Sequence, residues 1–518
     1  MELSLVGNCR GLINRGVLVF PGDVRKFWDN KSVSFPQRCD CPRGCLKSVV
    51  KASQRAVITE PIRSSVAAKS ESIERVRLFV GLPLDAVSDC QTVNHGRAIA
   101  AGLKALKLLG VEGVEIPVWW GISEKESMSE FDWSGYLAIA EMVREAGLKL
   151  HVTLCFHASD SPKIKLPNWV SKIGESQPDI YFKDRSGRHY KNTLSLAVDE
   201  LPLLEGKTPL QVYRGFCESF KSAFSSFMDS TITGITVGLG PEGDLRYPSH
   251  HKAKNENEAT GVGEFQCYDK HMLARLKLQA EAVGNPLWGL GGPHDAPRHD
   301  QTPTSANFFK DHGGSWDTDY GKFFLSWYSG DLVAHADRVL SMASDVFKEF
   351  SCAVYGKIPL MHAYYDTRSR ASELTAGFFN ADNNDGYDAV AAVFARHSCK
   401  MIIPGMDLRG EAPERLLAQI RSSCTKHGVE IAGRNTSLSK NGLEQISTSL
   451  SGVTVTDLFM YQRMGAEFFS PEHFPAFTQF VRSLSQPEMH ADDLPQGKQE
   501  GVVPSKIGSS TEAQMQVA

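Results

Sequence analysis

Short apolar runs alternate with helix-like stretches from about Arg77 to Leu484. The runs have the length and composition of buried parallel strands, and the stretches carry apolar residues at helical spacing and end at glycines such as Gly110 and Gly147. Eight such units favour an α/β fold of the (β/α)8 TIM-barrel type, with long loops on the C-terminal face of the strands, over an open sheet. The expected strands start near residues 78, 114, 148, 232, 357, 374, 401 and 429.

The two ends of the chain differ from this alternating body. Residues 1–71 are basic, rich in Arg, Ser and Val and poor in acids, which is typical of an organellar transit peptide, so we expect a disordered targeting segment there. Residues 72–484 form the expected barrel domain. The polar stretch 485–518 has no helical period and is predicted to be disordered.

Composition excludes several classes of function. The chain of 518 residues has a net charge of −4, and because its N-terminal segment is basic, the body is acidic, which argues against nucleic acid as a partner. No apolar run reaches the roughly 18 residues that a membrane span needs. Cys39, Cys41 and Cys45 lack a second ligand pair at zinc spacing, so we expect no metal site.

The end of the fourth expected strand carries the most chemical information. Glu242 and Asp244 follow that strand, at the position where α/β folds place their chemistry. The pattern Gly238-Leu-Gly-Pro-Glu-Gly243 matches a dinucleotide-binding motif, but Pro241 removes an amide and Glu242 would repel a pyrophosphate, so we expect no organic cofactor. Two carboxylates at a strand end are instead typical of a sugar-cleaving site.

Polar side chains also mark other expected strands, and Lys357 and His362 occupy the two ends of the fifth. Because the carboxyl ends of parallel strands meet at one rim, these side chains predict a ring of polar groups that can bind a small ligand. Trp119 and Trp120 end the second strand, where they serve either as platforms for sugar rings or as rim packing. The other polar positions are His157, Asp407, Arg434 and Asn435.

Five stretches of the body carry a recognisable signature, namely Val118-Trp-Trp-Gly121, Gly238-Leu-Gly-Pro-Glu-Gly-Asp-Leu-Arg-Tyr-Pro-Ser249, Gly263–Lys270, Phe323–Tyr328 and Glu373–Asn380. They closely resemble signatures of the plant β-amylases, glycoside hydrolase family fourteen. The resemblance covers about residues 77–484 and is highly specific. It implies a (β/α)8 barrel that releases β-maltose, with inversion, from the non-reducing ends of α-1,4-glucans such as starch.

The residues that match the catalytic positions of this family differ from it. The acid position falls at Asp244, one methylene shorter than the glutamate of active relatives, and the base position falls at Arg434. A guanidinium cannot accept a proton at neutral pH. Inverting hydrolysis needs one protonated carboxyl group and one carboxylate. Glu242 is the only nearby carboxylate that can substitute for the acid, and no residue replaces the base.

Among the other family features, the lid is lost and the sugar-contacting positions are retained. The family's flexible lid corresponds here to His157-Ala-Ser-Asp-Ser-Pro-Lys-Ile164, without the lid's glycines, and Pro117 and Pro404 stand where the family has an aspartate and a threonine. The positions that match the family's sugar contacts are nevertheless retained. These substrate-binding candidates are His157, Lys357, His362, Asn435, Thr436 and Arg463.

We therefore predict a catalytically inactive β-amylase-like pseudoenzyme of the plastid (chloroplast or amyloplast), resembling an inactive branch of the family. The expected role in starch degradation is weak binding of starch, another α-1,4-glucan or a maltooligosaccharide, or regulation of active starch-degrading enzymes. Two alternatives stay open. One is a weakly active exo-acting α-1,4-glucan maltohydrolase that uses Asp244 or Glu242, and the other is a sensor of a small sugar or another metabolite.

Overall fold

The computed structural model describes residues 76–250, 261–450 and 456–485. The chain divides into two units, Met1–Glu71 and Ser72–Ala518, and all described residues belong to the second. The expected targeting segment 1–71 therefore lies outside the described residues, and so does the expected tail 485–518 apart from Ser485, which ends the last helix.

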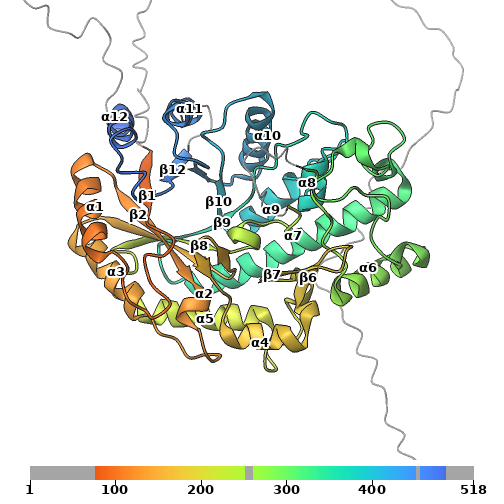
Figure 1. The fold of residues 1–518 in the computed structure, drawn as a ribbon, viewed down its shortest axis with the longest axis horizontal. Helices are drawn as coiled ribbons and strands as arrows, with labels where there is room; N and C mark the ends of the chain where they lie inside the picture. Colours follow the sequence, from red (N-terminus) through yellow and green to blue (C-terminus); the bar gives the residue numbers. More distant parts are fainter. Residues whose placement is uncertain (1–75, 251–260, 451–455, 486–518) are drawn as a thin grey trace, which may run out of the picture. The chain divides into compact units, whose positions relative to one another are not determined.

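Parallel strands close into a barrel in the second unit (Figure 1). Barrel strands that follow one another along the chain lie side by side. The barrel closes where Arg77–Val80 of the first strand pairs with Leu458–Tyr461 of the last. The fold class predicted from the sequence is confirmed. The barrel strands are β1 (Arg77–Gly81), β2 (Gly113–Trp119), β3 (Lys149–Cys155), β8 (Ile232–Val237), β9 (Ala353–Lys357), β10 (Lys400–Ile403), β11 (Ile431–Arg434) and β12 (Thr456–Tyr461).

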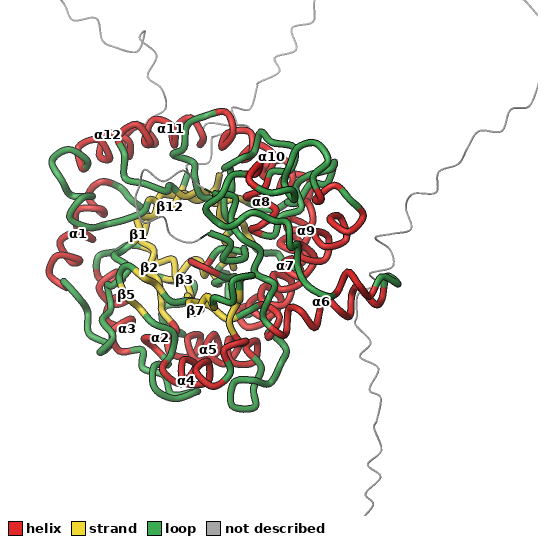
Figure 2. The backbone as a smooth tube through the Cα atoms, turned by 45° about the vertical axis from the view of Figure 1, so that its right-hand side comes forward, coloured by secondary structure: helices red, strands yellow, loops and turns green. Residues whose placement is uncertain are grey.

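A helix follows each barrel strand, and Figure 2 shows these helices surrounding the strands. The first helix buries Ile99, Leu103 and Leu106 on one face, and it ends at Gly110, whose φ of 87° lets its N–H bond to the carbonyl of Leu106. The helices are α1 (Gly96–Leu109), α3 (Ser134–Glu145), α5 (Pro209–Ala223), α7 (Asp319–Phe347), α9 (Asp388–Arg396), α10 (Glu411–His427), α11 (Lys440–Leu450) and α12 (Phe474–Ser485).

Side chains of the strands alternate between the inside of the barrel and the surrounding helices. In β1, Phe79 lies in an interior cluster with Tyr355 and Ile402, whereas Leu78 and Val80 belong to the larger core outside the barrel. Because both faces of each strand are buried, the strands read as nearly continuous apolar runs. This explains why most of them could be located from the sequence.

The structure contradicts one of the expected strands and adds one that was not expected. The stretch Leu374–Asn380 is not a strand, because Ala371–Ala376 form helix α8, which ends at Gly377 with a φ of 105°. Every residue of α8 is buried, and periodicity alone does not distinguish a short apolar run from a buried helix. The eighth strand is β12, so the strands expected near 401 and 429 are the sixth and seventh of the barrel, β10 and β11.

The limits of β9 also differ from the prediction. This strand was expected to begin at Lys357 and to end at His362, but Lys357 is its last residue and His362 lies in the loop that follows. The run after Lys357 is apolar, yet Pro359 lacks the N–H that a central strand needs. The correction places the Lys357 ammonium group at the carboxyl end of the strand.

Long connections leave the carboxyl ends of β3 and β8. The first contains two hairpins, β4 (Ser159–Asp160) with β5 (Lys163–Ile164) and β6 (Tyr181–Lys183) with β7 (His189–Leu194). None of the described helices combines the length and the apolar character that crossing a membrane requires. The helices within connections are α2 (Trp120–Ser123), α4 (Asn168–Ser176), η2 (Pro178–Ile180), η3 (Leu196–Val198), η4 (Pro241–Gly243), α6 (Lys270–Ala282), η5 (Pro286–Gly289), η6 (Pro303–Ser305) and η7 (Ser315–Asp317).

We predict that Gly121→Ala destabilises the barrel. A Cβ atom at Gly121 in α2 would come within 1.9 Å of the carbonyl oxygen of Lys165, so one of the two segments must move. Overpacking of this kind costs roughly 1–3 kcal/mol. Urea unfolding followed by tryptophan fluorescence should show a lower midpoint than in the wild type.

The matched control for this variant is Gly215→Ala in α5. A Cβ atom at Gly215 meets no atom within 4 Å, so the change should stabilise the helix by about 0.5–1 kcal/mol. Equal unfolding midpoints for the two variants would contradict the packing of α2 against Lys165.

Candidate functional site

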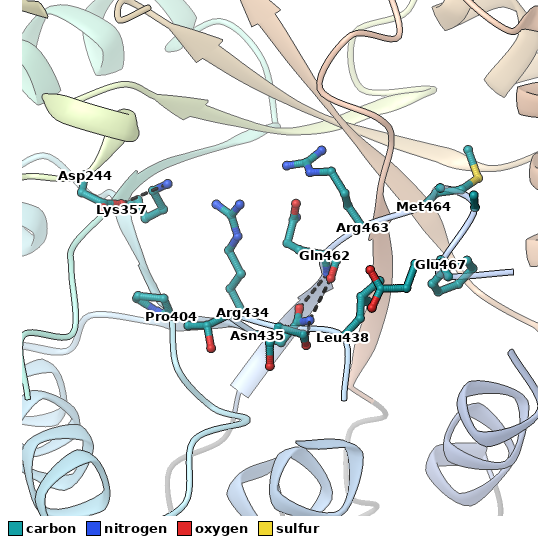
Figure 3. A pocket seen from close by; sticks show the side chains of 15 residues that line it. Asp244, Lys357, Pro404, Arg434, Asn435, Leu438, Gln462, Arg463, Met464 and Glu467 are labelled. Carbon is teal, nitrogen blue, oxygen red and sulfur yellow. Dashed lines mark hydrogen bonds and ion pairs between the residues drawn. The ribbon is translucent and has the colours of Figure 1, made fainter. Parts of the chain in front are cut away.

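A cavity of about 540 Å³ opens at the carboxyl ends of the strands β8 to β12, within the usual size range of small-ligand pockets (Figure 3). Active sites of (β/α)8 barrels lie at this rim. The lining residues are Asp244, Lys357, Pro404, Arg434, Asn435, Thr436, Ser437, Leu438, Gln462, Arg463, Met464, Gly465, Ala466, Glu467 and Phe468.

The backbone holds Asp244 beside Lys357. Residue 244 forms a parallel bridge with residue 357, and the N–H of Leu245 donates to the carbonyl of Lys357 at 2.8 Å. Side chains at paired positions of neighbouring parallel segments lie close together, and here Lys357 Nζ is 3.0 Å from Asp244 Oδ1. The same ammonium group donates to the carbonyl of Glu242 at 2.7 Å. The carboxylate and the ammonium group are therefore fixed together.

Positive charge keeps Asp244 ionised. Burial alone would raise the pKa of this carboxyl group, but the charges of Lys357, Arg246 and Arg434 outweigh burial and hold the pKa below its ordinary value. Arg246 Nε lies 3.5 Å from Asp244 Oδ2. A general acid needs a pKa near the working pH, so that it still carries a proton. The cations around Asp244 instead lower its pKa and favour loss of that proton.

Glu242 points away from the cavity. Its backbone has a φ of 55°, and its carboxylate is 54% exposed and pairs with Arg246 at 3.1 Å. Only its carbonyl oxygen faces Lys357. Glu242 is not among the cavity-lining residues, so its carboxylate does not take the place of Asp244 there.

Arg434 is the last residue of β11, and its side chain extends into the cavity between Lys357 and Arg463 (Figure 3). Among the described residues, its guanidinium group has no hydrogen bond or ion pair. A guanidinium group stays protonated to about pH 12 and above, so it donates hydrogen bonds but accepts no proton. Arg434 therefore brings a fixed positive charge to the cavity and no base.

A buried carboxylate lies beneath Arg463. Glu115 in β2 accepts hydrogen bonds from Thr153 Oγ1 at 2.7 Å and from Gln462 Nε2 at 3.2 Å, and it lies 3.7 Å from Arg463 Nη1. Arg463 also donates to the carbonyl of Leu82. Burial lowers the pKa of Arg463 to about 10. Glu115 was not predicted as a site residue from the sequence, although an acid inside an apolar strand signals a buried partner of opposite charge.

Asn435 and Thr436 line the cavity but are engaged in holding its loops. The Asn435 amide donates to the carbonyls of Ser437 and Gln462 at 2.9 Å each and accepts from the N–H of Gln462 at 2.7 Å. The N–H and the hydroxyl group of Thr436 both donate to Asp407. These contacts join the ends of β10, β11 and β12 and shape the floor of the cavity.

Several expected site residues lie outside this cavity. The His157 ring packs edge-on against Trp119 at 5.3 Å, and burial lowers its pKa to about 4. His362 is half-buried in its loop, with Nδ1 3.3 Å from the carbonyl of Leu360. Trp119 and Trp120 are both buried, so they act as rim packing and not as open platforms. The structure thus brings together Asp244, Lys357, Arg434, Asn435, Thr436 and Arg463, and leaves out Glu242, His157 and His362.

The stretch that corresponds to the family lid forms a short hairpin. Ser159 and Asp160 pair antiparallel with Ile164 and Lys163, and Asn192 donates to the Asp160 carboxylate at 3.1 Å. The hairpin is therefore tied to the neighbouring strand β7. Across the described residues, no group of three or more histidine, cysteine or acidic side chains is arranged to hold a metal ion.

Comparison with known proteins agrees with this geometry. A sequence profile of glycosyl hydrolase family 14 matches residues 79–487. The chain belongs to glycosyl hydrolase family 14. The assignment of Asp244 and Arg434 to the acid and base positions of the family stays a prediction from the motifs.

Three relatives give the family context. "Inactive beta-amylase 9" of Arabidopsis thaliana is 53% identical and covers 99% of each chain. "Beta-amylase 2, chloroplastic" of Oryza sativa subsp. japonica is 38% identical over 79% of this chain and 77% of its own. The crystal structure of the catalytic domain of beta-amylase from Paenibacillus polymyxa superposes with a TM-score of 0.66 at 25% identity, over 80% of this chain and 99% of that domain.

We predict that Asp244→Asn lowers the free energy of unfolding at pH 7 by about 3 kcal/mol, because it leaves the buried Lys357 ammonium group without its counter-charge. The folded pKa of Asp244 is lowered, so its contribution is fully present above the unfolded pKa of about 3.9 and is lost as the pH falls through the folded value. Urea unfolding between pH 7 and pH 3 should therefore show the gap to the wild type closing as the pH falls.

Glu242→Gln serves as the control for this measurement. The Glu242 carboxylate is 54% exposed, and exposed ion pairs contribute about 0–1 kcal/mol, so the change should be small at every pH. A gap between the wild type and Asp244→Asn that widens toward low pH would contradict the charge assignment.

Proposed function

We propose that this family 14 protein is catalytically inactive and that it binds α-1,4-glucan or a maltooligosaccharide at the barrel rim during starch degradation. The observation that carries the proposal is the charge state of the site. Asp244 is held as a carboxylate by Lys357 and Arg246, and the position of the base is occupied by the Arg434 guanidinium group.

Neither half of an inverting hydrolysis is available in this arrangement. The acid must protonate the leaving oxygen while a carboxylate removes a proton from water on the opposite face of the sugar. An ionised Asp244 has no proton to give, and Arg434 accepts none. Loss of general acid or base catalysis typically costs about 10²–10⁴-fold in rate for each group.

Slow maltohydrolysis is the second candidate function. It requires either Asp244 or Glu242 as the acid. Asp244 is ionised and has no proton to donate, and the Glu242 carboxylate lies outside the cavity, paired with Arg246.

The remaining candidate function is binding of a small sugar or another metabolite. A cavity of about 540 Å³ with polar lining supports it as well as it supports glucan binding.

The names of the relatives do not by themselves establish inactivity. The Arabidopsis relative is named inactive, whereas the rice relative at 38% identity carries no such word. Family membership alone is therefore compatible with either outcome, since function is determined by the site and not by the fold. Arg434 at the predicted base position and the ionised Asp244 support inactivity.

Location and partners form part of the same proposal. The basic composition of residues 1–71 and the chloroplast named for the rice relative support a plastid location, with the barrel domain at 72–484 and a polar tail after it. A glucan-binding protein without activity can act by occupying chain ends or by positioning active starch-degrading enzymes. We therefore include such enzymes among the proposed partners.

The first expected outcome concerns glucan binding without cleavage. The full chain should sediment with insoluble starch granules and should release no more maltose from soluble starch than its Asp244→Ala variant does. Both are measured on the same preparations, with bovine serum albumin as the sedimentation control. Maltose release by the wild type that disappears in the variant would instead make Asp244 a working acid.

The second expected outcome concerns restored carboxylates. The double variant Asp244→Glu with Arg434→Glu should remain at least about 10²-fold less active than an active family member, because the stretch 157–164 lacks the glycines of the family lid and closure over the substrate is then impaired. The single variants are the controls. Activity of the double variant equal to that of the active enzyme would show that these two positions alone decide the outcome.

A further inference from the structure

The cavity contains more positive charge than the recognition of a neutral sugar requires. Lys357, Arg434 and Arg463 direct their charged groups toward the same part of it (Figure 3). Lys357 and Arg463 have carboxylate partners, Asp244 at 3.0 Å and Glu115 at 3.7 Å. The Arg434 guanidinium group has none among the described residues. One positive charge in the cavity is therefore left without a carboxylate at ion-pair distance.

The remaining charged groups do not neutralise Arg434. Glu467 also lines the cavity, but Figure 3 shows it beside Leu438, on the other side of Gln462 from Lys357 and Arg434. Asp244 is shared between Lys357 and Arg246 at 3.5 Å, and Glu242 pairs with Arg246 at 3.1 Å, so these two carboxylates are offset by two cations before Arg434 is counted. The region around the tip of Arg434 is therefore positive overall.

The cations also disfavour one another. Burial lowers the pKa values of Lys357 and Arg463, and the charge of Arg434 adds to the lowering in both groups. Such mutual repulsion is relieved when an anion enters between the charges. The fixed charge of Arg434 thus favours an anionic ligand over a neutral one.

We propose that the cavity binds a phosphate ester of a sugar, with Arg434 as the main phosphate-binding residue and Arg463 and Lys357 beside it. The planar guanidinium fork matches phosphate oxygens and binds two of them at once. A neutral sugar offers only hydroxyl groups and leaves the charge of Arg434 unpaired. The cavity of about 540 Å³ has room for the ester and its sugar ring.

This inference rests on the proposed function, because it names the chemical form of carbohydrate that the same site recognises. A soluble sugar phosphate and a phosphate ester carried on a glucan chain both offer this chemistry. Replacement of a base by an arginine then changes a hydrolytic site into a site that detects the phosphorylation of its carbohydrate.

Calorimetric titration of the full chain tests the proposal. The probes are glucose 6-phosphate, glucose and inorganic phosphate at one ionic strength, and glucose 6-phosphate should bind about tenfold or more tightly than either of the others. Arg434→Gln should weaken its binding by about tenfold or more, because a charge-assisted bidentate contact is lost. The control is Arg409→Gln, since Arg409 pairs with Glu444 outside the cavity and should leave binding unchanged.

Two results would overturn the proposal. One is equal binding of inorganic phosphate and glucose 6-phosphate, and the other is wild-type affinity in a folded Arg434→Gln variant, with folding checked by its thermal unfolding midpoint. Sedimentation with phosphorylated and phosphate-free starch separates the two sources. A preference for phosphorylated starch identifies the glucan chain as the source of the phosphate ester. Equal sedimentation with the two starches, together with tighter binding of glucose 6-phosphate in the titration, identifies the soluble ester as the source.

Failure of this inference is distinguishable from failure of the proposed function. If only the inference fails, the chain still sediments with starch and releases no maltose, but glucose 6-phosphate binds no more tightly than glucose in the titration. If the proposed function fails, either maltose is released or the chain sediments with neither phosphorylated nor phosphate-free starch.

Discussion

The ion pair between Asp244 and Lys357 is built into the backbone of the barrel. The chain after β8 runs beside the end of β9, so that residue 244 bridges to residue 357 and Leu245 bonds to the Lys357 carbonyl. These backbone contacts hold the two side chains next to each other, and the carboxylate lies 3.0 Å from the ammonium group. Burial opposes the charge of Asp244, and the surrounding cations outweigh it. The group that the motifs match to the acid position is therefore a carboxylate with no proton to donate.

The other features of the rim follow from this distribution of charge. With Asp244 committed to Lys357 and Glu115 to Arg463, the remaining carboxylate among the lining residues is Glu467, and it forms no ion pair with Arg434. A (β/α)8 barrel tolerates such a change because its stability resides in the strands and helices, while its chemistry resides in side chains at the strand ends. The same scaffold can thus lose hydrolysis and keep a shaped polar cavity.

The barrel could be predicted because strands buried on both faces read as apolar runs, and the motifs placed Asp244 and Arg434 at strand ends. Other features depend on contacts that are distant in the sequence. Glu115 and Gln462 lie 347 positions apart, so their pairing cannot be read from spacing. The outward direction of Glu242 depends on its φ of 55° and on its pairing with Arg246. Helix α8 resembled a strand because a short buried run carries no distinguishing period.

The charge of Asp244 is the central claim of this account, and ¹³C NMR tests it most directly. Protein labelled with ¹³C at the aspartate side-chain carboxyl groups is titrated from pH 7 downward, and the resonance that is missing in Asp244→Asn assigns the residue. The account predicts a carboxylate chemical shift that persists below pH 4, because the pKa is lowered. Protonation of Asp244 above pH 5 would contradict it, since the group could then act as a general acid.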